Sequence, residues 1–208
     1  MTSCGIVLAG GRSTRMGTSK AELDWDGVSL LQRTAGVLTA TCDEVVIVAA
    51  AEQVVPTNGA TVVRDGIAER GPLQALSAGL DAAVRLGASA AFVCATDMPL
   101  LSPAFVSSVL AALTPDVDVV LPVEEQHEHP LAAGYSTDLA GTVTQLLVGG
   151  ERRLRALFDH CRVRRLTRAE LLMDPSLAAA DPQLDSLLNV NTPDQFAVVR
   201  ARAGHRRS

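Results

Sequence analysis

A loop rich in glycine and positive charge follows the first apolar run of the chain, residues 4–8. Glycines at 10, 11 and 17 leave room for backbone N–H groups to turn toward a ligand, and clusters of such groups favour anions, phosphates above all. The loop also carries Arg12, Arg15 and Lys20. It matches neither Gly-x-x-x-x-Gly-Lys-Ser/Thr nor Gly-x-Gly-x-x-Gly. These residues predict a triphosphate cradle, with a plain turn bearing solvated charges as the alternative.

Two acidic residues follow other apolar runs in the same way. Asp97 comes after residues 90–94, and its Asp-x-Pro setting suits a ligand of Mg²⁺, which prefers one or two carboxylates together with substrate phosphates. The alternative role of Asp97 is to cap the helix that follows Pro103. Asp65 comes after residues 61–63, where it either bonds a nucleobase or ribose or only begins a turn.

The second half of the chain holds two more polar groups. Residues 127–129 are His-Glu-His and superficially resemble metal ligands, although we favour a solvated loop. Arg152, Arg153 and Arg155 stand at the expected start of a helix, where cations oppose the macrodipole. Their position indicates either an anionic partner or a solvated basic face.

The composition argues against several classes of protein. The 208 residues are 48% hydrophobic and 20% charged, which is typical of a globular protein and not of a disordered one. A net charge of −5 and 3% aromatics argue against a nucleic-acid-binding face. No apolar run reaches membrane-spanning length, and no targeting segment precedes the first apolar run. We therefore expect a cytoplasmic protein without nucleic-acid or membrane partners.

The four cysteines, at positions 4, 42, 94 and 161, form no Cys-x-x-Cys pair. Disulfide scaffolds and zinc sites both require closer or more regular spacing. We therefore expect reduced, mostly buried thiols.

Apolar runs alternate with segments of helical character along the chain. The expected strands are 4–8, 44–48, 61–63, 90–94, 118–122, 131–135 and, at an edge, 162–166. The expected helices are 30–39 with Ser29 as N-cap, one from Pro72, one from Pro103 with Ser102 as N-cap, 138–147, 151–159, and one from Pro193 with Thr192 as N-cap. Because the strands are continuous apolar runs, the pattern predicts an α/β fold with a mainly parallel sheet and helices on both faces.

Ligands of such a sheet bind beyond the carboxyl ends of its strands. The glycine loop, Asp65 and Asp97 each follow a strand end. We therefore expect these three groups to meet at one rim of the sheet.

Six motifs form a set that extends from Leu8 to about Phe196. They are Leu-Ala-Gly-Gly-x-x-x-Arg-Met-Gly-x-x-Lys at 8–20, Gly71-Pro72-Leu73, Asp97-Met98-Pro99, His129-Pro130, Gly150-Glu151-Arg152-Arg153 and Asn189-Val190-Asn191-Thr192-Pro193. This set resembles the molybdenum cofactor guanylyltransferases, also called molybdopterin-guanine dinucleotide synthases. The last two motifs separate that family from the sugar-phosphate nucleotidyltransferases.

The resemblance implies a three-layer, Rossmann-like nucleotidyltransferase fold. It also implies a reaction in which GMP passes from GTP to the terminal phosphate of molybdopterin and pyrophosphate leaves. The expected cofactor is Mg²⁺, and the expected partners are GTP, molybdopterin and, transiently, proteins that supply the cofactor or mature molybdoenzymes. We expect one domain, 1–208, with a nucleotide-binding half at 1–122 and an acceptor-binding half at 123–203.

The resemblance and the residues together define an expected site. The catalytic residues are Arg15, Lys20 and Asp97, and Asp97 is also the metal ligand. The nucleotide-binding residues are Leu8, Ala9, Gly10, Gly11, Lys20, Asp65 and Asp97. The acceptor-binding residues are His129, Arg152, Arg153, Asn189 and Asn191.

One stretch departs from the family pattern. After the second strand the family often carries an asparagine that contacts the nucleotide, whereas residues 48–51 are Val-Ala-Ala-Ala. Two alternatives therefore stay open beside the guanylyltransferase. One is another nucleotidyltransferase, either a CTP-dependent molybdopterin cytidylyltransferase or an enzyme acting on a phospholactate or sugar phosphate. The other is a nucleotide-binding module without turnover, against which Lys20 and Asp97 argue.

Overall fold

The computed structural model describes residues 2–10, 23–51, 53–55, 59–65 and 71–205, with only the backbone of Asp65. Gly11, Arg15 and Lys20, three of the expected site residues, lie outside these ranges. The expectations for those residues, and for the side chain of Asp65, therefore stay predictions.

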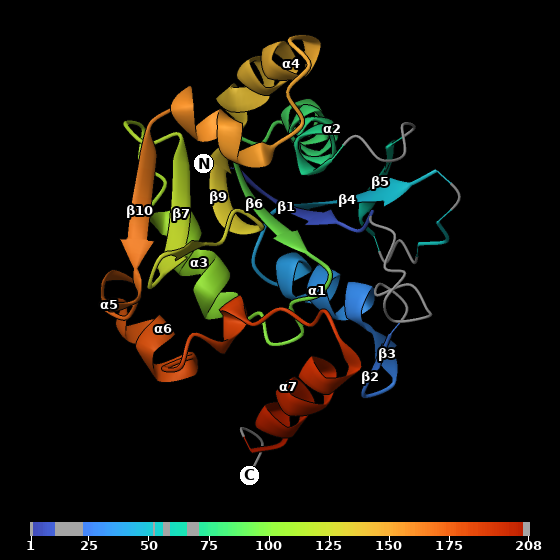
Figure 1. Ribbon diagram of the computed structural model, residues 1–208, viewed down its shortest axis with the longest axis vertical. Coiled ribbons are helices and arrows are strands. Elements are labelled where there is room, and N and C mark those ends of the chain that lie inside the picture. The colour runs from blue at the N-terminus through green and yellow to red at the C-terminus, as the bar shows by residue number, and fades with distance from the viewer. Residues whose placement is uncertain (1, 11–22, 52, 56–58, 66–70, 206–208) are drawn as a thin grey trace.

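The chain builds an eight-stranded sheet in the order β10-β7-β9-β6-β1-β4-β5, with β8 paired to β7 (Figure 1). Its strands are β1 (Ser3–Leu8), β4 (Glu44–Ala50), β5 (Thr61–Asp65), β6 (Ala90–Ala95), β7 (Val119–Glu124), β8 (His127–Glu128), β9 (Ala132–Ser136) and β10 (Val163–Thr167). A separate hairpin, β2 (Asp24–Trp25) and β3 (Val28–Ser29), lies where the sequence indicates a turn or short hairpin.

The sheet is mainly parallel, as predicted, but one central strand runs the other way. β9 is antiparallel to both of its neighbours, β6 and β7. β10 pairs in parallel with β7 at the edge of the sheet, where the sequence predicts its last strand.

Helices cover both faces of the sheet (Figure 1). The helices on one face are α1 (Leu30–Thr39), α3 (Pro103–Ala111), α5 (Arg168–Leu171) and α6 (Pro175–Ala180). The other face is covered by α2 (Pro72–Arg85), α4 (Ala140–Val148) and the 3₁₀ helix η3 (Leu154–Asp159). Alternate residues of each inner strand serve the two faces, so Ile6 packs under α2 and Val7 under α1. The helix α2 approaches β1 so closely that a Cβ on Gly79 would lie 2.7 Å from Cγ2 of Ile6.

A third apolar cluster lies at the lower end of the molecule, beside the last helix α7 (Pro193–His205). Trp25 of the small hairpin meets Phe196 of α7 edge to face, with ring centroids 5.4 Å apart. Leu100, from the segment after β6, and Val190 complete this cluster. The cluster therefore joins the beginning, the middle and the end of the chain.

The predicted helix caps are confirmed. Ser29 forms a capping box with Gln32, and Ser102 accepts the Phe105 N–H at 3.2 Å. Thr192 likewise accepts the Gln195 N–H at 3.2 Å. Because Ser102 caps α3, Asp97 is not needed for that purpose.

Two segments differ from the prediction. The helix expected over 151–159 is the shorter 3₁₀ helix η3, and it begins only after Arg153. The reason is that the Glu151 carboxylate accepts the N–H groups of Arg152 and Arg153, each at 2.8 Å, and holds this backbone outside the first turn. The sequence also failed to indicate α5, α6, the one-turn 3₁₀ helix η2 (Thr137–Leu139) before α4, and the one-turn 3₁₀ helix η4 (Asp185–Leu187).

All four cysteines are free thiols, with Cys4 and Cys94 buried and Cys42 and Cys161 partly buried. Burial raises the pKa of Cys4 to about 12 and that of Cys42 and Cys161 to about 11. The expectation of reduced, mostly buried thiols agrees with this environment. Of the helices in the described ranges, none is both long and apolar enough to cross a bilayer.

Candidate active site at the carboxyl rim of the sheet

The strand register brings the ends of four strands to the same rim. Leu8, the last residue of β1, pairs with Val48 of β4 on one side and with Ala95 of β6 on the other. Ala50 of β4 pairs with Asp65, the last residue of β5. The carboxyl ends of β1, β5 and β6 therefore lie at the same rim, as the sequence predicts.

The end of β1 offers the nucleotide mainly one open position. Leu8 and Ala9 are each 7% exposed, and the Ala9 N–H already donates to the Val48 carbonyl at 2.8 Å. Gly10 is exposed, and a Cβ there would meet only the Ala50 nitrogen, at 3.8 Å. Of these three residues, Gly10 is the one whose backbone can face a ligand closely.

Asp97 lies in a turn directly beyond the end of β6 and is partly exposed. Its carbonyl accepts the Val190 N–H at 2.8 Å, and the Arg33 Nε donates to the carbonyl of Pro99. Within the described residues, no three His, Cys, Asp or Glu side chains gather as a metal site. One carboxylate with phosphate oxygens is nevertheless a donor set that Mg²⁺ accepts, so Asp97 fits the expected ion.

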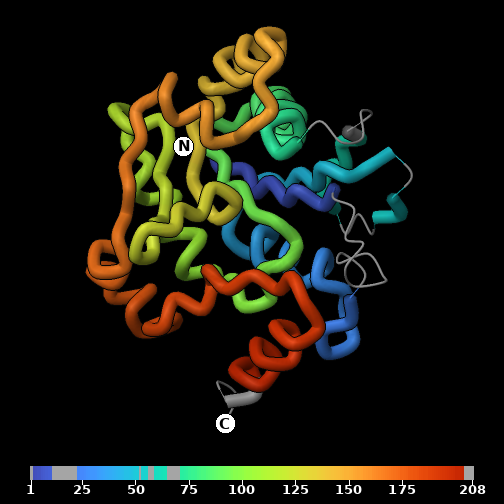
Figure 2. Tube along the Cα trace, viewed as in Figure 1, coloured from blue at the N-terminus to red at the C-terminus, as the bar shows by residue number. Residues whose placement is uncertain are grey.

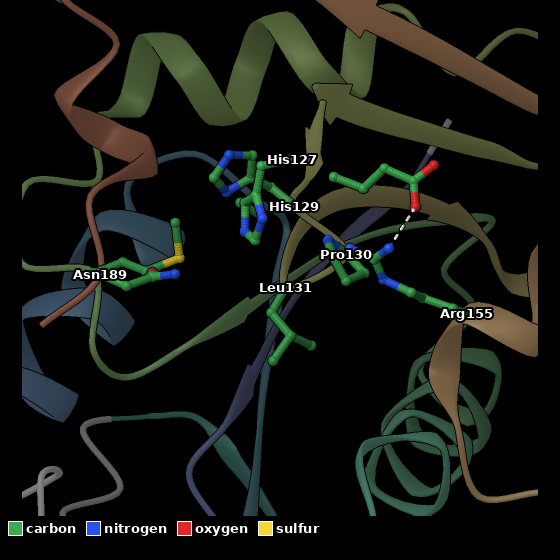
Figure 3. Close-up of a pocket in the computed structure, with 9 residues that line it drawn as sticks. His127, His129, Pro130, Leu131, Arg155 and Asn189 are labelled. Carbon is green, nitrogen blue, oxygen red and sulfur yellow. Dashed lines mark ion pairs between the residues drawn. The ribbon is translucent and has the colours of Figure 1, made fainter. Parts of the chain in front are cut away.

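A pocket of about 220 Å³ opens beside the Asp97 turn and is called here the histidine pocket. Its lining residues are Met98, His127, Glu128, His129, Pro130, Leu131, Ala132, Arg155 and Asn189. The sheet determines where this pocket lies. Leu131, one of the lining residues, accepts the Ala95 N–H at 3.3 Å and so joins the pocket to the end of β6. His127, His129 and Asn189 lie on one side of Pro130, and Arg155 on the other (Figure 3).

The expectation of a solvated loop at 127–129 is wrong for His129. Residues 127 and 128 form β8 in a hairpin with β7, and the His129 N–H is tied to the Pro122 carbonyl at 3.0 Å. The ring of His129 is 9% exposed and packs edge to face on His127, with centroids 4.7 Å apart. Hairpin formation turns this side chain inward, away from solvent.

His129 carries an unsatisfied polar atom into this pocket. Its Nε2 is buried and has no hydrogen-bond partner among the described residues. Burial lowers the pKa of His129 to about 4, and the nearby His127 adds to the effect. The ring is therefore neutral at pH 7. Because a buried polar atom without a partner is costly, this nitrogen is well suited to bond a ligand.

A second pocket, of about 570 Å³, adjoins the first and is called here the arginine pocket. Its lining residues are Pro72, Pro130, Leu131, Arg152, Arg153, Leu154, Arg155, Ala156 and Asp159. Gly71, the N-cap of α2, has a φ of +82°, and a Cβ there would lie 2.9 Å from the Arg152 carbonyl. Glycine thus allows the start of α2 to close one side of the pocket.

The two predicted arginines of this pocket have internal partners. Arg152 donates from Nη1 to the carbonyls of Leu147 and Glu151, at 3.1 and 2.7 Å. Arg153 is exposed and pairs with Glu151 at 2.9 Å, and this bond lowers the pKa of Glu151 to about 2. Their role toward an acceptor stays a prediction.

Arg155 belongs to both pockets, although sequence reasoning did not assign it to the site. It lies 3.4 Å from Glu128, which also accepts from the Nε of Arg165 at 3.0 Å. Leu154 and Leu157, three residues apart, are the buried residues of η3. That spacing was the available signal that Arg155, the first of the two residues between them, faces outward.

The predicted asparagines lie on the segment that leads into α7. Asn189 lines the histidine pocket, and its neighbour Val190 bonds the Asp97 carbonyl. The Asn191 N–H donates to the Gln195 side chain at 2.8 Å. In the tube view this C-terminal segment passes beside the segment after β6 (Figure 2). The structure thus brings Asn189, His129 and the Asp97 turn together.

Known proteins share both the sequence and the architecture of this chain. The model of a family described as the MobA-like NTP transferase domain matches residues 5–167. A probable molybdenum cofactor guanylyltransferase of Mycobacterium avium (strain 104) is 41% identical over 207 residues, covering 98% of each chain.

Two solved structures share the fold at low sequence identity. Molybdopterin-guanine dinucleotide biosynthesis protein A from Archaeoglobus fulgidus has a TM-score of 0.75 at 22% identity, covering 97% of this chain and 99% of its own. The 2-C-methyl-D-erythritol 4-phosphate cytidylyltransferase from Thermus thermophilus has a TM-score of 0.68 at 16% identity, covering 96% and 98%. These matches confirm the predicted nucleotidyltransferase fold, and their different names show that the fold alone does not select the substrates.

Proposed function

Since the chain belongs to the family of MobA-like NTP transferase domains and is a nucleotidyltransferase, we propose that it transfers GMP from GTP to the terminal phosphate of molybdopterin. An oxygen of the acceptor phosphate attacks the α-phosphorus of GTP. The bond from that phosphorus to the bridging oxygen breaks, and pyrophosphate leaves. The products are molybdopterin guanine dinucleotide and pyrophosphate.

The observation that carries this proposal is the bond from the Val190 N–H to the Asp97 carbonyl, at 2.8 Å. It joins the predicted acceptor segment to the predicted metal ligand. An acceptor held by Asn189 therefore lies next to the place where the nucleotide phosphates would be bound. This proximity supports the division into a nucleotide-binding half at 1–122 and an acceptor-binding half at 123–203.

Positioning and charge neutralisation are the main tasks of the protein in such a transfer. Gly10 and Gly11 would face the phosphates with backbone N–H groups, and Leu8, Ala9 and Asp65 would border the nucleoside. Arg15 and Lys20 would balance the phosphate charge. Asp97 would hold Mg²⁺, which when bound offsets charge at the α-phosphate.

The acceptor is expected to span both pockets. Arg152 and Arg153, joined by Arg155, supply positive charge for its terminal phosphate. The unpaired Nε2 of His129 and the amide of Asn189 supply hydrogen bonds to the polar edge of its pterin. No side chain is required as a covalent nucleophile.

The choice between GTP and CTP depends on the groups that border the base. At the end of β4, the side-chain oxygen of Gln53 accepts the Ala50 N–H at 3.4 Å, and Arg64 donates to the Ala50 carbonyl at 3.1 Å. These groups, and not an asparagine at 48–51, border the region where a base would lie. A CTP-dependent cytidylyltransferase for the same acceptor is therefore the alternative function.

One assay tests the proposal against its alternatives. Pyrophosphate release is measured with each of the four ribonucleoside triphosphates, with and without molybdopterin and Mg²⁺. We expect release only with GTP and molybdopterin together. Release with CTP instead would identify the cytidylyltransferase, and release with neither would contradict transfer to molybdopterin.

Cytoplasmic localisation follows from the proposed reaction and stays a proposal. Transient contact with proteins that supply molybdopterin or that mature molybdoenzymes is likewise a proposal. Neither nucleic acid nor a membrane has a role in this scheme.

A further inference from the structure

A wholly buried acid shapes the C-terminal segment before it reaches the site. Asp181, at the end of α6, is 0% exposed, and its two carboxylate oxygens accept the N–H groups of Asp185 and Ser186, each at 2.9 Å. The turn includes Leu184, which is buried with a φ of +52°. A buried carboxylate is stable only with such partners. It therefore fixes the backbone of Ser186.

Ser186 in turn reaches the segment after β6. Its hydroxyl is buried, accepts the Ser102 N–H at 3.0 Å, and lies 3.4 Å from the Leu100 carbonyl. The two polar groups of Ser102 thus have different partners. Its hydroxyl accepts the Phe105 N–H at the start of α3, and its N–H donates to the hydroxyl of Ser186. Sequence position gives no hint of this contact, since the two serines are 84 residues apart.

The segment between Asp97 and Ser102 is thus fixed along its whole length. Val190 binds it at the Asp97 carbonyl, Arg33 at the Pro99 carbonyl, and Ser186 at Leu100 and Ser102. The side chains of Met98, Leu100 and Leu101 are 4% exposed or less. Val190 and Ser186 are both 0% exposed, and of the three anchors Ser186 is the one whose backbone is itself bonded to a buried carboxylate.

We propose that Asp181 and Ser186 are positioning residues that hold the Asp97 carboxylate where it binds the metal–GTP complex. This inference rests on the proposed function of Asp97. Misplacing a reacting group or its ligand by about 1 Å can cost on the order of 10²-fold in rate. The C-terminal segment therefore serves two purposes, because it also presents Asn189 to the acceptor.

The test compares Ser186→Ala with Leu177→Val in the full chain. Leu177 of α6 is 0% exposed and packs in the same cluster as Leu184, so its truncation destabilises this region without removing the hydrogen bonds of Ser186 to the segment after β6. Mn²⁺ binding in the presence of GTP is measured by electron paramagnetic resonance. Turnover and both KM values are measured in parallel, together with the thermal midpoint of unfolding.

For Ser186→Ala we expect Mn²⁺ affinity in the presence of GTP and kcat each to fall about tenfold. The KM for the metal–GTP complex should rise in the same direction, because the two bind together, while the KM for molybdopterin changes less than about twofold. Asp181→Asn, which keeps only one acceptor oxygen for the two N–H groups, should also lower Mn²⁺ affinity and kcat. Leu177→Val should lower the thermal midpoint alone. Equal Mn²⁺ affinity and kcat in Ser186→Ala and Leu177→Val would overturn the inference.

A further variant separates this inference from the proposed function. Asp97→Asn should abolish GTP-dependent Mn²⁺ binding. If it does so and Ser186→Ala has no effect, the positioning role is wrong and the metal assignment stands. If Asp97→Asn binds Mn²⁺ normally, both are wrong.

Discussion

The segment that carries Asp97 and the turn that carries Arg152 and Arg153 are proposed to serve one site, but the fold holds them differently. The first is bound at backbone groups by Val190, Ser186 and Arg33. The second depends on Glu151, whose partner Arg153 has a side chain 82% exposed. An exposed ion pair contributes little to stability, because solvent screens it. The comparison indicates that the proposed metal side is fixed by the fold itself, whereas the proposed acceptor side has an exposed internal partner, Arg153, that a ligand could replace.

The largest expected effect is at the fixed side. Asp97→Asn keeps the shape of the side chain and removes its charge, so we expect kcat to fall on the order of 10²-fold or more. The thermal midpoint should be unchanged, because the residue lies beyond the end of a strand. Steady-state kinetics measures this, with Asp138→Asn at an exposed position as control. Normal turnover in a folded Asp97→Asn variant would contradict the proposal that Asp97 is the metal ligand.

The second prediction concerns His129, the buried member of the acceptor side. Its pKa of about 4 lies below the ordinary value of 6.5, so between these values the unfolded chain binds a proton that the folded chain does not. The contribution of His129 to the free energy of unfolding should therefore be fully present above pH 6.5 and be lost as the pH drops toward 4.

Urea denaturation across this pH range tests that expectation. His129→Gln should remove this part of the pH dependence, whereas His160→Gln, at an exposed position, should keep it. An unchanged slope in His129→Gln would mean that the imidazole is not held neutral by burial.

A third prediction concerns the end of β1. Gly10→Val places a side chain on the open side of the strand end, where it should block phosphates without disturbing the core. We expect GTP affinity to fall about tenfold, or about 1.4 kcal/mol. Lys20→Ala should also weaken binding, by loss of charge. Calorimetry with GTP measures both, and Gly141→Val, in open space on α4, is the control. Wild-type affinity for GTP in both site variants would contradict the phosphate-binding role of the loop and favour a plain turn.

The smallest effect is expected at the adjustable side. Arg153→Glu and Asn191→Ala should raise the KM for molybdopterin roughly three- to tenfold and leave that for GTP nearly unchanged, since loss of a uniform binding contact raises KM alone. Arg162→Glu is the matched control, because Arg162 is also exposed and also pairs with an acid, Asp118, at 2.6 Å. Equal changes in both KM values, or none, would contradict the two-site division.

Local features were predictable from the sequence wherever neighbours along the chain determine them. Ser29 and Ser102 act on residues three positions away, and the strands are continuous apolar runs. The grouping of the strand ends at one rim was predictable as well, because the carboxyl ends of parallel strands lie on one side of a sheet. The positions of Gly10 and Asp97 at the same rim were therefore predictable from the sequence.

Features that depend on distant partners could not be predicted. The direction of β9 is set by its pairing with β6 and β7, and its own residues are as apolar as those of a parallel strand. Ser186 and Asp181 are polar residue types that are usually exposed, yet both are buried by contacts within the folded C-terminal segment. His129 is turned inward only because the hairpin of β7 and β8 forms.

The position of β9 also affects the order in which this protein can fold. β9 lies between β6 and β7 but follows both in the sequence. During synthesis, β7 therefore has no place in the growing sheet until residues 132–136 have emerged from the ribosome. A chain ending at residue 122 would leave β6 with an open edge and β7 without a neighbour, a state prone to aggregate. The proposed nucleotide-binding half, residues 1–122, is thus not a unit of folding.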